Sequence, residues 1–499
     1  MAGIELSALN RTKLFAEYLS INPVFLSLGF NNVLHKDKLT AIKKKRASKD
    51  LNLISIYDYF LQAHTIKSEK KLTSEHLNDF RLLEVAEKPS DLRLFDDKGR
   101  HIGHCRRNED DLLLSYINYL DPKKQKIYRR ETFDVRGFLI RTELIDSKNE
   151  DEDMLQDLYH RPNGSVGMIK TSTIKKNTAY LNYIQLLSKQ NTLLARFESE
   201  VELIEYWLAD IIKKNPKAIF IVDRCNEFQE CLFKAKEKIQ KNKIKIISVI
   251  HGGHAGGDTF SQETNLWYKN VLENKHKVDK IIVLTQGQKK DIIDRYGPGN
   301  YEVIPHGYNV NNSSKQLSQR KKNKVVYLAR FSPEKRHDLA LEIFKKVLDK
   351  KSDAELHLFG FGSNDAEKKI KDKIKELNIE SNVWIHEFDQ SIDQIYQEAS
   401  LSILTSATEG FCMSVLESLS NGCPVISFDI KYGPSEMIQN GINGFLITPF
   451  NTDEFAEKIL TLLNEDAILE EIILNTPKTV EQFDFKNVSK LWEDLLEEL

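Results

Sequence analysis

The stretch TSATEGFCMSVLESLSNGCPV, residues 405–425, joins a short apolar run to a helical pattern and carries two glutamates. The apolar run LSILTS (401–406) predicts a buried strand, and Glu409 and Gly410 follow at its end. The helical pattern after them places Glu417 about two turns along a helix, on its inner side. Ligands of open parallel sheets bind beyond the carboxyl ends of the strands. The stretch therefore predicts an α/β domain with a ligand site between these two glutamates.

The same alternation of short apolar runs and helical patterns extends from about residue 205 onward. It is typical of βαβ units, so we predict two Rossmann-like domains that meet near residue 311. The strands of the first domain are expected at 218–223, 245–251, 280–285 and 301–306, and those of the second at 324–330, 355–360, 382–388, 401–406, 424–429 and 444–449.

The region from 67 to 204 has a different pattern. Alternating segments such as HIGHCRRNEDDLLLSYINYL (101–120) are separated by polar turns, which predicts antiparallel strands inserted into the first domain. The chain begins instead with an amphipathic helix, in which Leu9 and Phe15 can face a core. A Rossmann-like half normally opens with a strand, and that strand is apparently missing here.

Composition excludes several classes of protein. The 72 lysines and arginines nearly balance the 74 aspartates and glutamates, so the overall charge predicts no polyanionic partner. Basic runs at 43–49 and 121–130 could still follow a polyphosphate chain, or they could be solvated faces. The five cysteines have no paired C-x-x-C spacing, which argues against a disulfide framework or a zinc cluster. No apolar run reaches the roughly 20 residues that span a bilayer, so we expect a cytoplasmic protein, at most peripheral to the cell membrane.

Two cations lie where a diphosphate would need them. In YLARFSPEKRHDLALEIF (327–344), Arg330 follows a strand and Lys335 comes five residues later. Ser332 and Pro333 are expected to cap the helix that begins behind them. Fixed cations of this kind stabilise a departing nucleoside diphosphate without a metal. The alternative is that both side chains are solvated or paired with acidic residues.

Two further loops follow predicted strands. Gly360 and Gly362 end the third strand of the second domain and would let a ligand approach the backbone, although a lone G-x-G is a weak signal. In SVIHGGHAGGD (248–258), His251 follows an apolar strand, and its neighbouring glycines make a pliable loop. His254 is the weaker candidate of the two histidines. Without a third ligand nearby they argue against a zinc site.

Taken together, Glu409-x7-Glu417, the upstream cations, the glycine loop and FDIKYGPSEMIQNGINGFL (428–446) resemble the retaining GT-B glycosyltransferases of family four. FDIKYGPSEMI is similar to the wall teichoic acid α-glycosyltransferases, among them the poly(glycerol phosphate) α-glucosyltransferases, and to their relatives that glycosylate serine-rich adhesins. Similarity is strong over about 205–465. The family's first helix usually follows a strand and a glycine-rich turn, of which only Gly3 is present.

The resemblance implies roles for individual residues. The strand-end Glu409 would contact the donor sugar, and His251 would touch the donor sugar or the acceptor near the reacting carbon. Arg330 and Lys335 would grip the diphosphate, and Glu417 would bind ribose. The expected catalytic residues are Arg330, Lys335, Glu409 and His251, and the expected donor-binding residues are Gly360, Gly362, Gly410, Phe411, Cys412 and Glu417, with no metal and no cofactor besides the UDP-sugar substrate.

The implied fold is α/β of the GT-B type, with two Rossmann-like domains facing a cleft. The expected domains are 1–66 and 205–310 for the N-terminal Rossmann-like domain, 67–204 for a β-rich insertion that binds acceptor or oligomerises, 311–480 for the nucleotide-sugar-binding domain, and 481–499 for a helix that packs back on the N-terminal domain.

The implied activity moves glucose or N-acetylglucosamine from a UDP-sugar to hydroxyls of a cell-wall polymer, most simply teichoic acid, with retention of configuration. Two alternatives stay open: transfer to serine-rich or Ser-Asp repeat adhesins, and a non-catalytic GT-B companion subunit. The expected partners are the UDP-sugar, a polyanionic polymer or Ser-rich protein and further copies of the chain, with no nucleic acid. The sequence leaves the sugar, the acceptor and the oligomeric state undecided.

Overall fold

The protein is described by a computed structural model. It describes the chain except residues 1–2, 45, 66–76, 78–79, 86–87, 109–112, 147–151, 177, 240–242, 256–262, 312–315 and 387–390. The chain forms two compact units. We call residues 8–216 with 231–242 the sheet unit, and residues 1–7, 217–230 and 243–499 the Rossmann unit. The domain boundaries expected from the sequence stay a prediction.

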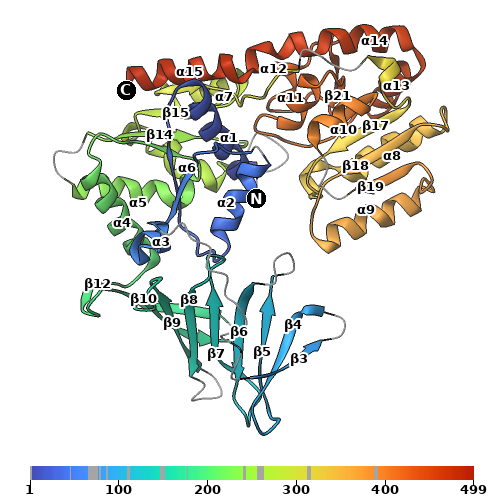
Figure 1. The fold of residues 1–499 in the computed structure, drawn as a ribbon. Coiled ribbons are helices and arrows are strands. Elements are labelled where there is room, and N and C mark those ends of the chain that lie inside the picture. Colours follow the sequence, from blue (N-terminus) through green and yellow to red (C-terminus); the bar gives the residue numbers. More distant parts are fainter. Residues whose placement is uncertain are drawn as a thin grey trace. The chain divides into compact units, whose positions relative to one another are not determined.

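The sheet unit is built on ten antiparallel strands that follow one another in chain order across a single sheet (Figure 1). This confirms the antiparallel strands expected in that region. The strands are β3 (Arg81–Val85), β4 (Lys88–Phe95), β5 (His101–Arg107), β6 (Leu114–Leu120), β7 (Ile127–Phe133), β8 (Leu139–Asp146), β9 (Glu152–His160), β10 (Val166–Lys175), β11 (Thr178–Leu187) and β12 (Leu193–Phe197).

The sheet buries one face at each end. Over β4 to β6, Leu92, Cys105 and Ile117 form one cross-strand row in a buried cluster. Over β9 to β11, the buried row contains Tyr159 and Met168, and it packs with α3 (Ile56–Leu61) and α4 (Glu200–Lys214). Because successive residues of a strand point to opposite faces, the strand register places these two cores on opposite faces of the sheet.

Smaller elements complete the sheet unit. Strands β1 (Val24–Ser27) and β2 (Asn52–Ser55) pair in parallel, and α2 (Leu34–Lys43) connects them. The expected N-terminal helix is α1 (Gly3–Tyr18), in which Leu9 and Phe15 are buried. Both residues lie in the part of the helix that belongs to the sheet unit.

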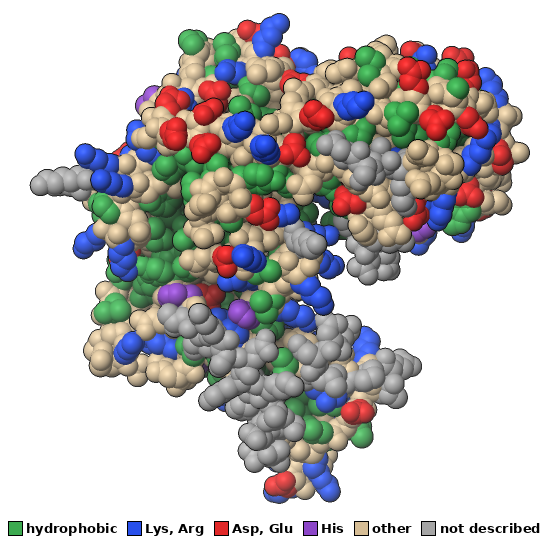
Figure 2. Space-filling model, turned by 45° about the horizontal axis from the view of Figure 1, so that its top comes forward, with side chains coloured by type: hydrophobic (Ala, Val, Ile, Leu, Met, Phe, Trp, Pro, Cys, Tyr) green, Lys and Arg blue, Asp and Glu red, His purple; other side chains and the backbone are tan. Residues whose placement is uncertain are grey.

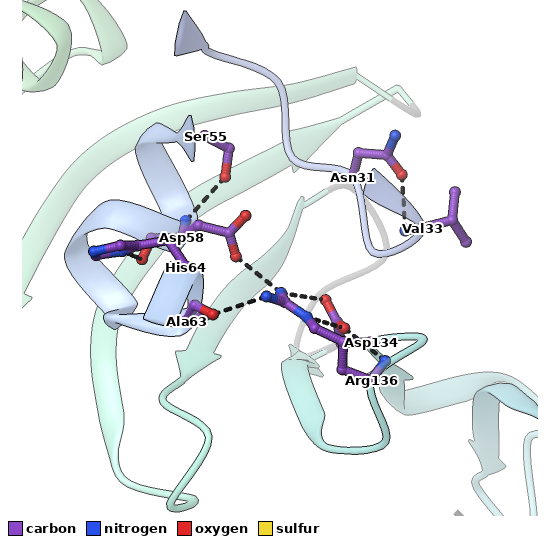
Figure 3. Close-up of polar contacts among 8 residues, drawn as sticks. All are labelled: Asn31, Val33, Ser55, Asp58, Ala63, His64, Asp134 and Arg136. Atoms are coloured by element: carbon purple, nitrogen blue, oxygen red, sulfur yellow. Dashed lines mark hydrogen bonds and ion pairs between the residues drawn. The ribbon is translucent and has the colours of Figure 1, made fainter. Parts of the chain in front are cut away.

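Arg136 ties the turn between β7 and β8 to the segment around α3 (Figure 3). Its side chain is only 5% exposed. The guanidinium donates to Asp134 Oδ1 from Nε at 2.7 Å, to Ala63 O from Nη1 at 2.8 Å and to Asp58 Oδ1 from Nη2 at 3.0 Å. Burial disfavours the charged guanidinium, but the two carboxylates outweigh this effect and raise its pKa. The ion cluster therefore joins segments that are far apart in the sequence.

The Rossmann unit contains two parallel sheets. One is β13-β14-β15-β16, and the other has the order β19-β18-β17-β20-β21-β22. The strands are β13 (Ile219–Val222), β14 (Lys245–Val249), β15 (Lys280–Val283), β16 (Tyr301–Val303), β17 (Lys324–Leu328), β18 (Glu355–Phe359), β19 (Val383–His386), β20 (Leu401–Leu404), β21 (Val425–Phe428) and β22 (Gly444–Ile447). Each lies within a run predicted from the sequence, so these predictions are confirmed.

Helices cover the parallel sheets and contribute most of the largest buried cluster. They are α5 (Cys225–Lys238), of which residues 225–230 belong to the Rossmann unit, and α6 (Leu266–Glu273), α7 (Gln286–Tyr296), α8 (His337–Leu348), α9 (Asn364–Glu376), α10 (Ile392–Glu398), α11 (Met413–Ser420), α12 (Pro434–Met437), α13 (Thr452–Asn464), α14 (Asp466–Asn475) and α15 (Phe485–Glu498). The C-terminal helix α15 contacts the first parallel sheet, because Lys280 Nζ of β15 lies 2.8 Å from Glu498 Oε2.

The surface carries both signs of charge. Acidic and basic side chains are interspersed over the face drawn in Figure 2, in agreement with the nearly balanced composition. Within the described residues, no helix combines the length and the apolar character needed to cross a membrane.

Loss of the Arg136 cluster should destabilise the sheet unit. Arg136→Met would leave Asp58 and Asp134 as buried carboxylates without their cation, and breaking a buried pair in this way costs about 3–5 kcal/mol. The measurement is hydrogen exchange at the amides of β7 and β8, combined with chemical denaturation. Arg100→Met is the matched control, because Arg100 also pairs with an aspartate near a strand turn but is well exposed. Equal exchange rates in both variants would contradict a stabilising role for the cluster.

Candidate active site

Lys335 and Glu409 form a buried ion pair at the carboxyl ends of two neighbouring strands. Lys335 Nζ lies 2.5 Å from Glu409 Oε1, and the two side chains are 15% and 13% exposed. Lys335 follows β17 and Glu409 follows β20, and these strands are adjacent in the sheet although α8, β18, α9, β19 and α10 separate the two residues along the chain. Strand order reverses between these two strands, so the pair lies at the topological switch point, where open parallel sheets bind ligands.

Charge and hydrogen bonding both fix this pair. Burial disfavours the charged ammonium of Lys335, but the Glu409 carboxylate outweighs that effect and raises the pKa of Lys335. Glu409 Oε1 also accepts a hydrogen bond from Ser406 Oγ at 2.7 Å. An ammonium has three donors, so Lys335 can bind a further anionic oxygen while it keeps Glu409.

The backbone around the pair is fastened as well. Thr405 Oγ1 donates to the carbonyl of Lys335 at 3.2 Å and to that of Arg336 at 3.0 Å. The amide of Ala407 donates to the carbonyl of Glu334 at 2.8 Å. Residues 405–409 and the turn at 333–336 are therefore held together independently of the ion pair.

Arg330 is placed beside this pair by Glu334. Its Nη2 donates to Glu334 Oε1 at 3.1 Å, and the side chain is 57% exposed. Burial opposes ionisation of Glu334, yet the hydroxyl of Ser332 and the two neighbouring cations outweigh it and lower the pKa of Glu334. Arg330 is thus salt-bridged at the rim, while Lys335 lies deeper.

The prediction that a helix begins directly after Ser332 is wrong. The Ser332 side chain accepts no cap hydrogen bond from the backbone, and its Oγ donates to Glu334 Oε1 at 2.6 Å. A short 3-10 turn at Pro333–Lys335 follows, and α8 begins only at His337, after Arg336 in the left-handed region.

Gly360 and Gly362 bring two protein segments together. A Cβ at Gly360 would lie 2.0 Å from Ala329 O, and one at Gly362 would lie 2.5 Å from Phe331 O. The loop after β18 therefore lies against the segment that carries Arg330. Close approach of protein backbone explains both glycines, whereas the sequence suggested approach of a ligand.

Glu417 lies in a second group on α11. This helix begins at Met413, two residues later than expected. Burial, together with the charges of Glu417 and Asp393, raises the pKa of Tyr308, whose hydroxyl donates to Asp393 Oδ1 at 2.6 Å. The side chains of Phe411 and Cys412 are buried in the core, so only their backbone is available to a ligand.

His251 is buried after β14 and pairs with an aspartate that the sequence reasoning missed. Its Nε2 lies 2.7 Å from Asp223 Oδ1, and its side chain is 5% exposed. The ring stacks against His306 with 5.4 Å between centroids. The signal that could have found Asp223 is its position directly after the apolar strand β13, next to β14 in the sheet.

The loop after His251 is less pliable at its start than its glycines suggested. Gly252 N donates to Tyr268 Oη at 2.9 Å, and Gly252 O accepts from Gln288 Nε2 at 2.7 Å. Asn265 Nδ2 donates to Gly253 O at 3.1 Å. Three side chains therefore brace these two glycines, and Gly256 and Gly257 lie outside the described residues.

Gly410 joins the loop of His251 to the loop of Glu409. A Cβ at Gly410 would lie 2.0 Å from His251 O and 2.8 Å from Gly252 Cα. Any other residue would push these loops apart. The structure thus brings His251, Gly410, Glu409, Lys335 and Arg330 into one connected site, and Glu417 belongs to the neighbouring group on α11.

His254 is the second histidine of this loop, and its ring packs against Tyr432. Burial lowers its pKa to about 4, so the ring is neutral at pH 7. It stacks on Tyr432 with 6.0 Å between centroids, and Tyr432 Oη donates to Asp291 Oδ2 at 2.7 Å. Across the described residues, no group of three or more His, Cys, Asp or Glu side chains is arranged to hold a metal ion.

Comparison with known proteins agrees with this architecture. Residues 310–479 match the family described as glycosyl transferases group 1. Poly(ribitol-phosphate) alpha-N-acetylglucosaminyltransferase of Staphylococcus aureus is 26% identical over 99% of this chain and 96% of its own length. Poly(glycerol-phosphate) alpha-glucosyltransferase of Bacillus subtilis is 25% identical over 100% of this chain and 73% of its own length.

A solved structure shows the same fold over nearly the whole chain. A mutant of S. aureus TarM, crystallised with fondaparinux, alpha-GlcNAc-glycerol and UDP, has a TM-score of 0.82 and 23% identity and covers 99% of this chain and 97% of its own. Residues 310–479 are therefore similar to the group 1 glycosyltransferases, and the likeness over nearly the whole chain shows that the protein has the GT-B fold.

Proposed function

We propose that this protein transfers glucose or N-acetylglucosamine from a UDP-sugar to hydroxyls of a teichoic acid polymer, with retention of configuration. The two relatives named above act on poly(ribitol phosphate) and poly(glycerol phosphate), which supports an acceptor of this class. The observation that carries the proposal is the buried contact of Lys335 with Glu409 at the switch point, with Arg330 beside it.

This contact suits the donor chemistry. Lys335 would bind the diphosphate and compensate the charge that develops on its leaving oxygen, and Arg330 would do so from the rim. Glu409 would accept hydrogen bonds from sugar hydroxyls through the oxygen that Lys335 leaves available. Glu417 would bind the ribose hydroxyls. The departing phosphate would then take the proton of the incoming hydroxyl on the same face of the sugar.

A cationic face of the sheet unit fits a polyanionic acceptor. Register places Arg93, His104, Asn118 and Arg130 in one row across β4 to β7, on the face opposite the buried Leu92 cluster. Arg106 lies in the adjacent row, where it pairs with Asp91. We call Arg93, His104, Arg106, Tyr116 and Arg130 the cationic sheet face.

Two contacts orient the guanidinium of Arg130. Its Nε donates to Asn118 Oδ1 at 2.6 Å, and its Cζ lies 5.2 Å from the centroid of Tyr116. Arg106 approaches the same ring at 5.9 Å. An aromatic ring flanked by two guanidinium groups can contact both the apolar and the phosphate parts of a polyol phosphate chain. These contacts support the acceptor proposal.

Removal of the buried cation should slow transfer. Lys335→Met is expected to lower kcat by about 10²- to 10³-fold, because the leaving diphosphate loses a fixed positive charge. Steady-state release of UDP from UDP-glucose and UDP-N-acetylglucosamine, with purified poly(glycerol phosphate) as acceptor, measures this change. Lys322→Met is the control, since Lys322 forms an exposed pair with Asp466 in the same parallel-sheet domain. Unchanged turnover in Lys335→Met would refute the assignment, and a wild-type protein inert toward every UDP-sugar would favour the companion-subunit alternative.

Chelation should leave transfer intact. Lys335 and Arg330 already supply positive charge to the diphosphate, so activity after treatment with EDTA and gel filtration is expected to match the untreated enzyme. The assay is incorporation of radiolabelled sugar into polymer, with and without added manganese. Strict dependence on manganese would contradict catalysis by these two side chains.

The cationic sheet face should control affinity for the acceptor. Arg93→Ser with Arg130→Gln is expected to raise KM for poly(glycerol phosphate) and to weaken its dependence on salt, because two charges that attract phosphate are lost. KM for the UDP-sugar should stay constant. Arg100→Ser removes an exposed arginine of the β4–β5 turn and serves as the control. A Ser-Asp repeat protein used in parallel distinguishes the adhesin alternative, and an unchanged polymer KM would discard this surface.

A further inference from the structure

Two neighbouring strand ends build a carboxylate–imidazole pair, and the second ring nitrogen has no hydrogen-bond partner within the described part of the chain. Asp223 directly follows β13 and His251 follows β14, and these parallel strands pair with Val222 opposite Ser248. His251 Nε2 lies 2.7 Å from Asp223 Oδ1. A carboxylate only accepts hydrogen bonds, so this contact requires the proton on Nε2.

The opposite nitrogen of the ring is buried. His251 Nδ1 has no hydrogen-bond partner among the residues that the structure describes. A buried polar atom without a partner is costly, so such an atom in a native protein calls for a ligand or a solvent molecule. In the tautomer with its proton on Nε2, the ring has a lone pair on Nδ1, and this lone pair can accept one hydrogen bond.

The ring has little freedom to turn toward another partner. It stacks against His306, and the backbone that follows it is held by Tyr268 through Gly252. Gly410 lies against His251 O, which fixes the loop of Glu409 next to it. The ring of His251 is therefore held in one orientation, and its backbone lies against the loop that carries Glu409.

We propose that Asp223 is a positioning residue that keeps His251 in the Nε2–H tautomer, so that Nδ1 accepts a hydrogen bond from a hydroxyl of the bound hexose. The proposal rests on the function proposed above and assigns a task to a residue outside the expected site. Asp223 acts through His251, since second partners of this kind set the tautomer and orientation of an imidazole.

The tautomer can be read without any substrate. Long-range ¹H–¹⁵N correlation of the protein labelled at its 13 histidines, with His251 assigned from the spectrum of His251→Gln, should show Nε2 protonated and Nδ1 bare. Asp223→Asn can present an amide N–H to Nε2, and it should shift the proton to Nδ1. Asp223→Glu should keep the wild-type tautomer.

The turnover number kcat should fall in variants that change the tautomer of His251. Asp223→Asn is expected to lower kcat by about 10- to 100-fold, the usual effect of losing such an orienting partner, with unchanged affinity for UDP alone. Asp223→Glu should recover a large part of kcat. Asp279→Asn is the matched control, because Asp279 accepts from the amide of Ile246 at 2.9 Å in β14 and has no contact with the ring of His251 among the interactions described. This variant should keep both tautomer and kcat when it is folded.

A wild-type Nδ1–H tautomer, or a tautomer unchanged in Asp223→Asn, would overturn the proposal whatever the activity. Normal kcat in Asp223→Asn with the altered tautomer would overturn the functional part. If the wild type transfers no sugar, the proposed function fails, and a tautomer that depends on Asp223 would still show that this carboxylate orients the ring.

Discussion

The site depends on one buried ion pair, Lys335 with Glu409, at the switch point of a parallel sheet. Burying two charges is costly, and it is tolerated here because each charge neutralises the other and Ser406 adds a hydrogen bond. In the proposed function, the diphosphate of the donor would bind at this pair, because the Lys335 ammonium still has N–H donors for a phosphate oxygen. The same desolvation that makes the pair expensive therefore strengthens its interaction with an anionic donor.

Rigid backbone contacts surround this pair. Close approach at Gly410 seats the loop of Glu409 on that of His251, and close approach at Gly360 seats the loop after β18 on the segment of Arg330. Catalytic groups need positions that vary by less than an ångström or so to be effective. In this protein the loops are fixed by close backbone contacts at glycines and by hydrogen bonds from side chains such as Thr405 and to Tyr268.

In the sheet unit, different faces of the sheet are buried at its two ends. Its ten strands bury one face at one end and the opposite face at the other, so the cationic face of β4 to β7 stays available while Leu92 and its neighbours are covered. Arg136 and its two aspartates attach this sheet to the segment around α3. The surface proposed to bind the acceptor therefore lies on the face opposite the buried Leu92 cluster.

Sequence reasoning succeeded where burial is uniform. Parallel strands covered on both faces appear as short apolar runs, which is why each strand of the Rossmann unit coincides with a predicted run. It failed at the start of α8, because a short 3-10 turn at Pro333–Lys335 and Arg336 in the left-handed region stand where the sequence predicts a helix behind Ser332. The close approach of Gly360 to Ala329 O joins two separate segments, so no local pattern shows it.

The sequence by itself determined the class of the fold, the strands and the placement of Glu409, Lys335 and His251 at strand ends, because hydrophobic periodicity and strand-end position are local properties of the chain. Only the tertiary structure decided that Lys335 contacts Glu409, that Gly410 lies on His251 and that Asp223 faces the imidazole. These contacts join residues that are 28 positions apart or more, as the 28-residue separation of Asp223 and His251 shows. Such pairings follow from strand order, which no local pattern encodes.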